Sequence, residues 1–203
     1  TRALEGFDLF GRTIGVIGTG AIGKNVVKIA SGFGMKVLMF DKFPAQGFET
    51  PDAKYVPLDE LLAQSDIVTL HVPYFPENHH LLNREAIAKM KRGAYVINTA
   101  RGELIDTAAL LEALKSGAVA GAGLDVLEGE RALKDEMELV MGTESINTLK
   151  AVIRDHMLID MPRVIVTPHI AFFSREAYTE ILSTSAKNIA NFAAGTPSNI
   201  VKM

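Results

Sequence analysis

One glycine-rich stretch, residues 15–23 with the sequence GVIGTGAIG, restricts the fold more than any other part of the chain. It joins an apolar run, residues 13–17, which is typical of a short buried strand, to a helical pattern. Gly18, Gly20 and Gly23 have the G-x-G-x-x-G spacing. In such a segment the first glycine permits a tight turn, the second leaves room for a pyrophosphate, and the third lets the helix pack closely against the strand. The N–H groups at the start of the helix would then face the phosphates.

A second strand pattern, residues 36–40, ends in Asp41, which lies eighteen residues after Gly23. A carboxylate at about this distance can accept hydrogen bonds from the ribose hydroxyls of the adenosine half, and its charge repels a 2′-phosphate. The glycines and Asp41 therefore predict a dinucleotide site that prefers NAD over NADP. The neighbouring Lys42 leaves binding of NADP open.

Strand and helix patterns alternate along the rest of the chain. The predicted strands are residues 13–17, 36–40, 66–70, 94–98, 119–124 and 163–167. The predicted helices are residues 21–33, 58–63, 84–91, 107–116, two runs within 131–160, and 175–194. Residues 42–55 are rich in Pro, Gly, Gln and Asp and read as a surface connection. This alternation predicts an α/β fold with a doubly wound parallel sheet covered on both faces. Because no linker or repeat interrupts it, we expect one domain over residues 1–203.

Composition excludes several classes of protein. The chain has 203 residues, of which 48% are hydrophobic, yet no segment approaches the roughly 20 uninterrupted apolar residues of a membrane helix. The net charge is −3 and the Lys and Arg residues are scattered, so we expect neither nucleic acid nor a membrane as a partner. There is no cysteine, which excludes disulfides and thiolate metal sites and fits a cytoplasmic protein.

The histidines His79 and His80 are adjacent. In an extended chain their side chains point apart, which is poor geometry for one metal ion, and we expect no metal site. Their loop faces the predicted cleft, so a secondary role near cofactor or substrate stays open.

Polar and charged residues follow almost every predicted strand. They are Gly18-Thr19-Gly20, Asp41, His71-Val72-Pro73, Asn98-Thr99-Ala100-Arg101, Asp125 and Pro168-His169. Ligands of open doubly wound sheets bind outside the carboxyl ends of the strands, which predicts Arg101, Asp125 and His169 at the rim that holds the dinucleotide.

A His can exchange a proton with a substrate oxygen, and an Arg can hold a carboxylate or polarise a carbonyl. A carboxylate bound to the His would fix its tautomer, and Glu130 is our candidate for that role. Together these groups indicate hydride transfer to or from a nicotinamide.

Five segments together resemble the NAD-binding domain of the D-2-hydroxyacid dehydrogenases, most closely their D-lactate dehydrogenase branch. They are residues 15–23, 66–73 (DIVTLHVP), 98–102 (NTARG), 121–126 (GAGLDV) and 167–171 (TPHIA), and they span almost the whole chain. The resemblance implies a Rossmann-type fold and a cytoplasmic oxidoreductase that reduces a 2-oxo acid to a D-2-hydroxy acid with NADH. It also implies a homodimer formed through this domain.

The resemblance also implies roles for individual residues. Arg101 would bind the substrate, His169 would be the acid/base, and Glu130 would be its carboxylate partner. Asp125 would contact the nicotinamide carboxamide. The implied cofactor-binding residues are Gly18, Gly20, Ala21, Ile22, Gly23, Asp41, Val72, Pro73, Asn78, Thr99, Ala100, Arg101, Asp125 and His169.

Members of this family also carry a substrate-binding domain, built mostly from residues that precede the cofactor domain. Since this chain starts almost at its first predicted strand, we expect the cofactor domain of a larger two-domain enzyme, inactive or weakly active alone. The alternative function is a non-enzymatic NAD(H) sensor, a dimerisation module of the corepressor type. Within the enzyme class, 3-phosphoglycerate, glyoxylate and formate are alternative substrates. Glu130 disfavours formate, because that branch is expected to carry Gln there.

Overall fold

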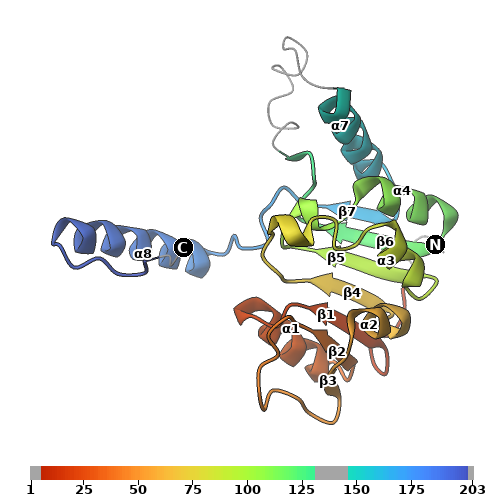
Figure 1. Ribbon diagram of the computed structural model, residues 1–203, viewed down its shortest axis with the longest axis horizontal. Coiled ribbons are helices and arrows are strands. Elements are labelled where there is room, and N and C mark those ends of the chain that lie inside the picture. Colours follow the sequence, from red (N-terminus) through yellow and green to blue (C-terminus); the bar gives the residue numbers. More distant parts are fainter. Residues whose placement is uncertain (1–5, 131–145, 201–203) are drawn as a thin grey trace. The chain divides into compact units, whose positions relative to one another are not determined.

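The computed structural model describes residues 6–130 and 146–200. The chain divides into two units, Thr1–Pro168 and His169–Met203, and each is described by itself. The described part of the first unit contains a seven-stranded parallel sheet with the order β3-β2-β1-β4-β5-β6-β7 (Figure 1). The strands are β1 (Thr13–Ile17), β2 (Lys36–Phe40), β3 (Ala53–Tyr55), β4 (Ile67–Leu70), β5 (Ala94–Asn98), β6 (Val119–Leu124) and β7 (Val164–Val166). The predicted doubly wound α/β fold is therefore confirmed.

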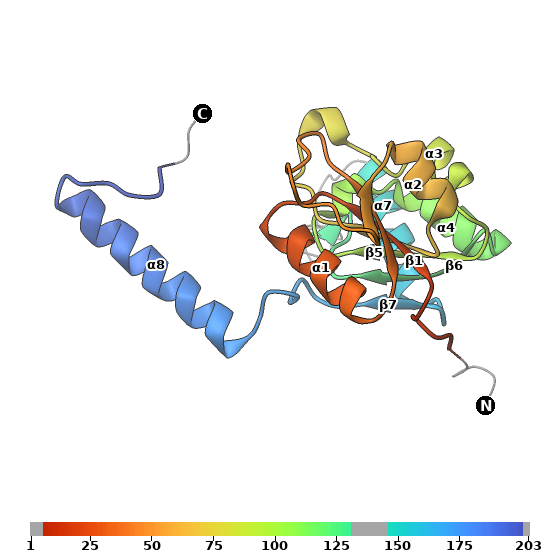
Figure 2. The same ribbon diagram turned by 90° about the horizontal axis from the view of Figure 1, so that it is seen from below.

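Helices lie on both faces of this sheet. The first unit contains α1 (Ala21–Gly32), α2 (Leu58–Gln64), α3 (Arg84–Lys89), α4 (Thr107–Ser116) and α7 (Ile146–Ile159), with short 3-10 turns η2 (Pro76–Asn78) and η3 (Gly102–Leu104). Figure 2 shows α1 on one side of the strands and α2, α3 and α4 on the other. In the part of the chain that the structure describes, no helix combines the length and apolar character needed to cross a membrane.

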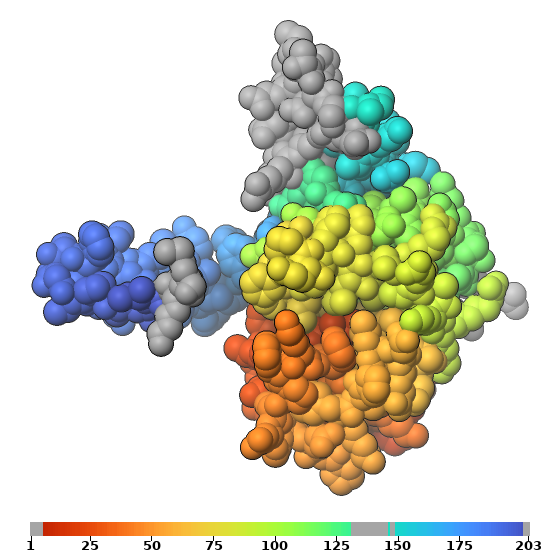
Figure 3. Space-filling view, viewed as in Figure 1, coloured from red at the N-terminus to blue at the C-terminus, as the bar shows by residue number. Residues whose placement is uncertain are grey.

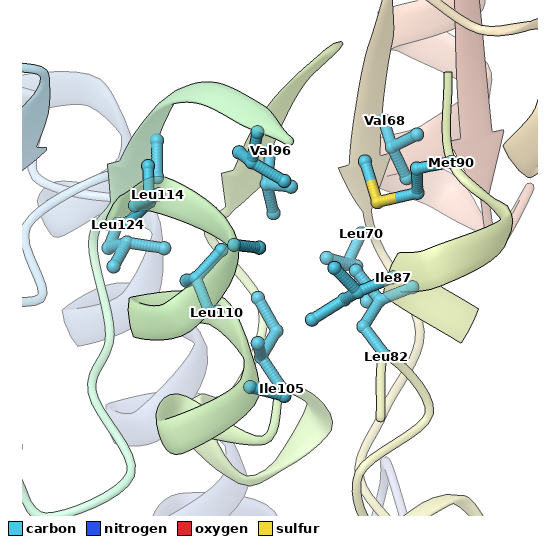
Figure 4. Close-up of a cluster of buried hydrophobic side chains, with 14 of the residues drawn as sticks. Val68, Leu70, Leu82, Ile87, Met90, Val96, Ile105, Leu110, Leu114 and Leu124 are labelled. Atoms are coloured by element: carbon cyan, nitrogen blue, oxygen red, sulfur yellow. The ribbon is translucent and has the colours of Figure 1, made fainter. Parts of the chain in front are cut away.

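Each face of the sheet has its own core. The larger core joins α2, α3 and α4 to the strands, and Figure 4 shows part of it, with Ile87 and Leu110 beside the strand residues Leu70 and Val96. The smaller core lies under α1 and contains Val16, Val27, Ala30, Val37 and Met39, with further residues of β1 and β3. Because both faces are covered, the central strands are mostly apolar rather than alternately polar.

All six predicted strands are present, four of them with the predicted bounds. The prediction of a surface connection over residues 42–55 was wrong at its end, where β3 pairs in parallel with β2. Ala53 is fully buried there, and Tyr55 donates or accepts a hydrogen bond with Thr19 at 2.7 Å. This strand therefore depends on tertiary contacts rather than on a long apolar run. Of the two helical runs predicted within 131–160, the second is α7 and the first lies outside the described residues.

The sequence has Ile22, Val26, Ile29, Ala30 and Phe33 at helical spacing, and part of this predicted apolar face is exposed. Ile22 and Ile29 of α1 face solvent, as does Phe33 directly after it, while Gly23, Val27 and Ala30 meet the sheet. A Cβ on Gly23 would lie 1.9 Å from the carbonyl oxygen of Gly18, so only this face allows the helix to approach so closely.

The second unit contains α8 (Arg175–Ala193), which begins at Ser174, whose side chain accepts a hydrogen bond from Ala177 N–H. None of the residues of α8 is buried. The helical spacing of the apolar residues Ile181, Leu182, Ile189 and Phe192 predicts that they form core. This prediction was wrong, since all four are exposed. The described part of this unit has a single helix, and one helix alone cannot enclose an apolar face.

Candidate functional site

The order of the strands reverses direction at β1. Within the sheet, β2 lies next to β1 in one direction and β4 lies next to it in the other. Open α/β sheets bind ligands at the point where the strand order reverses in this way. The glycine loop follows β1 and His71 follows β4, with His71 N–H donating to the carbonyl of Ile17 at 2.7 Å. Burial lowers the pKa of His71, so its ring is neutral at physiological pH. His71 thus packs beside the glycine loop.

The glycine loop has the geometry that its sequence predicts. Gly18 has φ 95°, and a Cβ there would lie 2.6 Å from the carbonyl oxygen of His71. At Gly20, by contrast, a Cβ would meet no atom within 4 Å. The fold therefore needs glycine at positions 18 and 23, whereas Gly20 leaves open space next to the backbone. That space is where the fingerprint places a pyrophosphate.

The start of α1 also fits an anionic ligand. Its N-cap is Gly20, no side chain caps the helix, and its first turn contains no acidic residue. Helices α3, α4 and α8 differ, because Asn83, Asp106 and Ser174 accept hydrogen bonds from their first turns. Backbone N–H groups and the positive end of the helix dipole remain available at α1, and the residues present thus fit a dinucleotide.

Asp41 lies beside this loop. Its Oδ2 accepts hydrogen bonds from Thr19 N–H (2.6 Å) and Thr19 Oγ1–H (3.0 Å), and its Oδ1 accepts from Phe43 N–H (2.8 Å). Partial burial raises the pKa of Asp41, but these hydrogen bonds and the charge of Lys24 outweigh it and hold the pKa below the ordinary value. A fixed negative charge therefore stands at the end of β2, where the sequence predicts the ribose contact.

The turn after β5 is built around Asn98, which is almost fully buried. Its amide Nδ2 donates to the carbonyl of Arg101 (2.8 Å), and its Oδ1 accepts from Ala100 N–H (3.0 Å). These bonds fold residues 98–101 into a tight turn that leaves Arg101 exposed at the rim. Sequence reasoning quoted Asn98 only as part of a motif. The signal for its structural role was an amide at the end of an otherwise apolar strand.

Asp125 is buried at the end of β6. Its Oδ1 accepts a hydrogen bond from Thr167 Oγ1 at 2.5 Å, and its N–H donates to the carbonyl of Asn98 at 2.9 Å. The carboxylate is therefore bound to the residue after β7 and the backbone of Asp125 to the end of β5, at the same edge of the sheet as Asp41.

Glu130 follows Gly129, which contacts α7. The N–H of Gly129 donates to Asp155 Oδ2 at 3.0 Å, and Asp155 lies fully buried on α7. Burial is the main influence on Asp155 and raises its pKa to about 6, the charge of Glu128 adds to this, and the bond from Gly129 and the charge of His156 oppose it. The other oxygen, Oδ1, has no hydrogen-bond partner among the described residues. Sequence reasoning missed Asp155, because a single Asp in an amphipathic helix reads as a surface residue.

The remaining predicted residues lie on loops at the same edge. Asn78 donates from Nδ2 to the carbonyl of Pro73 (2.8 Å) and accepts from Phe75 N–H (2.7 Å), so its observed role is to close the loop after β4. Thr99 and Pro73 are exposed, and Val72 and Ala100 are partly buried.

His169 is the first residue of the second unit and directly follows Pro168. It has φ 55°, a conformation that a residue other than glycine seldom adopts and that is frequent at functional sites. The structure thus gathers Gly18–Gly20, Asp41, Arg101 and Asp125 at one edge of the sheet, and the pair of His169 with Glu130 stays a prediction.

Comparison with known proteins agrees with this geometry. Residues 1–171 match the family model described as D-isomer specific 2-hydroxyacid dehydrogenase, NAD binding domain. A 2-hydroxyacid dehydrogenase homolog of Haemophilus influenzae is 44% identical, over 96% of this chain and 56% of the relative. A D-lactate dehydrogenase of Escherichia coli is 40% identical, over 96% of this chain and 57% of the relative.

A solved structure of D-lactate dehydrogenase from Aquifex aeolicus, complexed with NAD and lactic acid, superimposes with a TM-score of 0.83. It is 39% identical and the match covers 91% of this chain and 54% of that one. The chain thus spans slightly more than half the length of the relatives that it matches. By sequence and by fold, it belongs to the D-isomer specific 2-hydroxyacid dehydrogenases, and what it carries is their NAD-binding domain.

Proposed function

We propose that this chain is the cofactor domain of an NAD-dependent D-2-hydroxyacid dehydrogenase that reduces a 2-oxo acid, with pyruvate and D-lactate as the substrate pair. The observation that supports this most directly is the open space at Gly20, which adjoins the uncapped start of α1 and lies on the same loop as Thr19, the residue that binds the anionic Asp41. This combination accepts a pyrophosphate and a ribose at the edge where Arg101 and Asp125 stand.

The proposed cofactor-binding residues have separate roles. The first turn of α1 holds the pyrophosphate, and Asp41 accepts hydrogen bonds from the adenosine ribose. Asp125 contacts the carboxamide group of the nicotinamide and so orients the ring. Ala21 and Ile22 would contribute backbone N–H groups, and residues 72–73, 78 and 99–100 would line the site. When bound, the reduced cofactor supplies the hydride.

The proton and the substrate are handled by three other side chains. Arg101 binds the substrate carboxylate and polarises the carbonyl, because its planar guanidinium donates two parallel hydrogen bonds. His169 gives a proton to the carbonyl oxygen as it becomes an alkoxide. Glu130 accepts a hydrogen bond from the ring of His169 and so fixes its tautomer and orientation.

We also propose that residues 1–203 function as one cofactor domain within a longer, two-domain, cytoplasmic enzyme, and that this enzyme is a homodimer. The coverage of slightly more than half of each relative supports the proposal of a longer enzyme. The selection of the 2-oxo acid then falls largely to the other domain.

The experiment is NADH oxidation by the enzyme that carries this chain, with pyruvate, longer 2-oxo acids, glyoxylate and hydroxypyruvate as substrates. We expect pyruvate or a longer analogue to react fastest, and His169→Ala to lower turnover by at least about a hundredfold while NADH affinity stays within about twofold. Near-normal turnover in His169→Ala would contradict the assignment. Tight NADH binding without turnover of any substrate would support the non-enzymatic sensor instead.

A further inference from the structure

Two histidines and a glutamate form a cluster outside the residues assigned to cofactor and substrate. His79 and His80 follow η2, and Glu128 lies in the segment after β6. One ligand-capable atom from each lies within 4.8 Å of the others. The loop that carries the histidines is at the molecular surface, shown in yellow in Figure 3.

The backbone brings the two imidazole rings together. His80 has φ 52°, a left-handed conformation, and the ring centroids of His79 and His80 are 3.8 Å apart with 24° between the planes. The expectation that adjacent histidines point apart assumes an extended chain, and this backbone is not extended. Hydrogen bonds from His80 N–H to the carbonyl of Glu103 and from Leu82 N–H to that of Leu104, both 2.9 Å, hold it in place.

Groups from other parts of the chain orient these side chains. His80 Nε2–H donates to Glu128 Oε1 at 2.7 Å, and Thr107 Oγ1–H donates to the other carboxylate oxygen at 2.9 Å. The Tyr74 hydroxyl lies 3.4 Å from His79 Nδ1. The Tyr74 contact involves Nδ1, so Nε2 is the other ring nitrogen with which His79 could bind an ion. Hydrogen bonds of this kind to the ligating side chains are what metal sites use to set ligand orientation.

From this arrangement we infer that His79, His80 and Glu128 form a binding site for a divalent transition-metal ion of the Zn²⁺ class. Two imidazoles and a carboxylate suit Zn²⁺, Ni²⁺ or Cu²⁺ rather than Mg²⁺ or Ca²⁺, which prefer oxygen ligands. Three protein ligands leave the fourth tetrahedral position to water.

The adjustment that a metal ion requires is small. Bonds of about 2.0–2.2 Å to a tetrahedral ion put ligand atoms about 3.4 Å apart. His80 Nε2 and Glu128 Oε1 would separate from 2.7 Å by about 0.7 Å, and the ion would take the place of the proton that they share. His79 is exposed, so its ring can turn toward the ion at the expense of only its stacking on His80 and its contact with the Tyr74 hydroxyl.

The test is calorimetric titration of the metal-free 203-residue chain with ZnCl₂, accompanied by the visible absorption of Co²⁺ as a probe of four-coordinate geometry. We expect one saturable site for Zn²⁺ and none for Mg²⁺. His79→Ala leaves the hydrogen bond between His80 and Glu128 intact, so it should weaken Zn²⁺ binding at least about tenfold without lowering the Tm of the metal-free chain. Glu128→Gln should weaken binding to a similar extent.

His156→Ala is the matched control, because His156 is also exposed and lies on α7, outside the cluster. It should bind Zn²⁺ as the unmodified chain does. The proposal is overturned if the chain has no saturable Zn²⁺ site, or if His79→Ala binds as tightly as His156→Ala. Either result would mean that the cluster is only a hydrogen-bonded anchor for the loop.

Discussion

Replacing Asp155 by Asn should make the protein more stable at neutral pH, although it removes a buried charged residue. Asp155 is fully buried, one of its carboxylate oxygens has no partner among the described residues, and its pKa is raised from 3.8 to about 6. Asn keeps an oxygen for the hydrogen bond from Gly129 N–H but carries no charge. The variant therefore loses the cost of ionising a buried group and retains the contact with Gly129, while the N–H₂ group of Asn replaces the unpartnered Oδ1 as a buried polar group.

The size and sign of the effect follow from the two pKa values of Asp155. Below about pH 4 the carboxyl is protonated in both the folded and the unfolded chain, and it contributes no difference. Between about pH 4 and 6 the unfolded chain releases this proton and the folded chain keeps it, so the free energy of unfolding falls as the pH rises. Above about pH 6 the carboxyl is ionised in both states, and its raised pKa lowers the free energy of unfolding by its full amount. The two pKa values set this amount at about 3 kcal/mol at most, and allowing for solvent screening gives about 1–3 kcal/mol.

The assay is urea denaturation of the 203-residue chain and of Asp155→Asn between about pH 4 and 8. The difference in the free energy of unfolding between the two proteins should be near zero at the acid end, grow through pH 5, and level off above pH 6. Asp160→Asn, an exposed carboxylate just after the same helix, is the control and should give no such profile. If Asp155→Asn is no more stable than the parent at pH 8, or if its advantage is equal at both ends, the reasoning about the buried charge is refuted.

The remaining predictions concern the glycine loop and Asp41. Gly20→Ala should fold normally, since its Cβ meets open space, and should weaken NADH binding at least about tenfold in a calorimetric titration. Gly23→Ala should fail to fold stably in thermal denaturation, because its Cβ would lie 1.9 Å from a backbone oxygen. Equal NADH affinity in Gly20→Ala and the parent would contradict the assigned role of this glycine. Asp41→Asn should raise the affinity for NADPH relative to NADH at least about tenfold. Because the pKa of Asp41 is lowered, the preference of the unmodified chain for NADH should persist at every pH above about 4. A preference that disappears between pH 5 and 8 would contradict this.

The strands and the glycine loop were predictable because each depends on a local pattern. Residues 13–17 form a strand, and a helix begins just after Gly20. A short apolar run followed by closely spaced glycines is a local signal for this strand, turn and helix. The edge strand at residues 53–55 was not predictable in this way. Its three residues are held by β2 and by the contact of Tyr55 with Thr19, which lies far away in the sequence.

In the candidate site, the edge of the sheet at which the proposed residues lie was predictable, and the packing around them was not. The types and positions of Asp41, Arg101 and Asp125 pointed to the correct edge of the sheet, because the carboxyl ends of parallel strands share one edge. The burial of Asp155 and the left-handed backbone of His80 depend on tertiary packing, for which single residues in a sequence carry no signal.

The missing cap of α1 links the cofactor to the lifetime of the protein in the cell. A side-chain cap stabilises a helix by about 1 kcal/mol, and α1 has none, so a bound phosphate completes the helix in its place. A ligand present at about a hundred times its Kd adds about 2.7 kcal/mol to the free energy of unfolding. Molecules without cofactor therefore unfold more often and are the first to reach proteases, so the supply of NAD would set how much of this protein a cell retains.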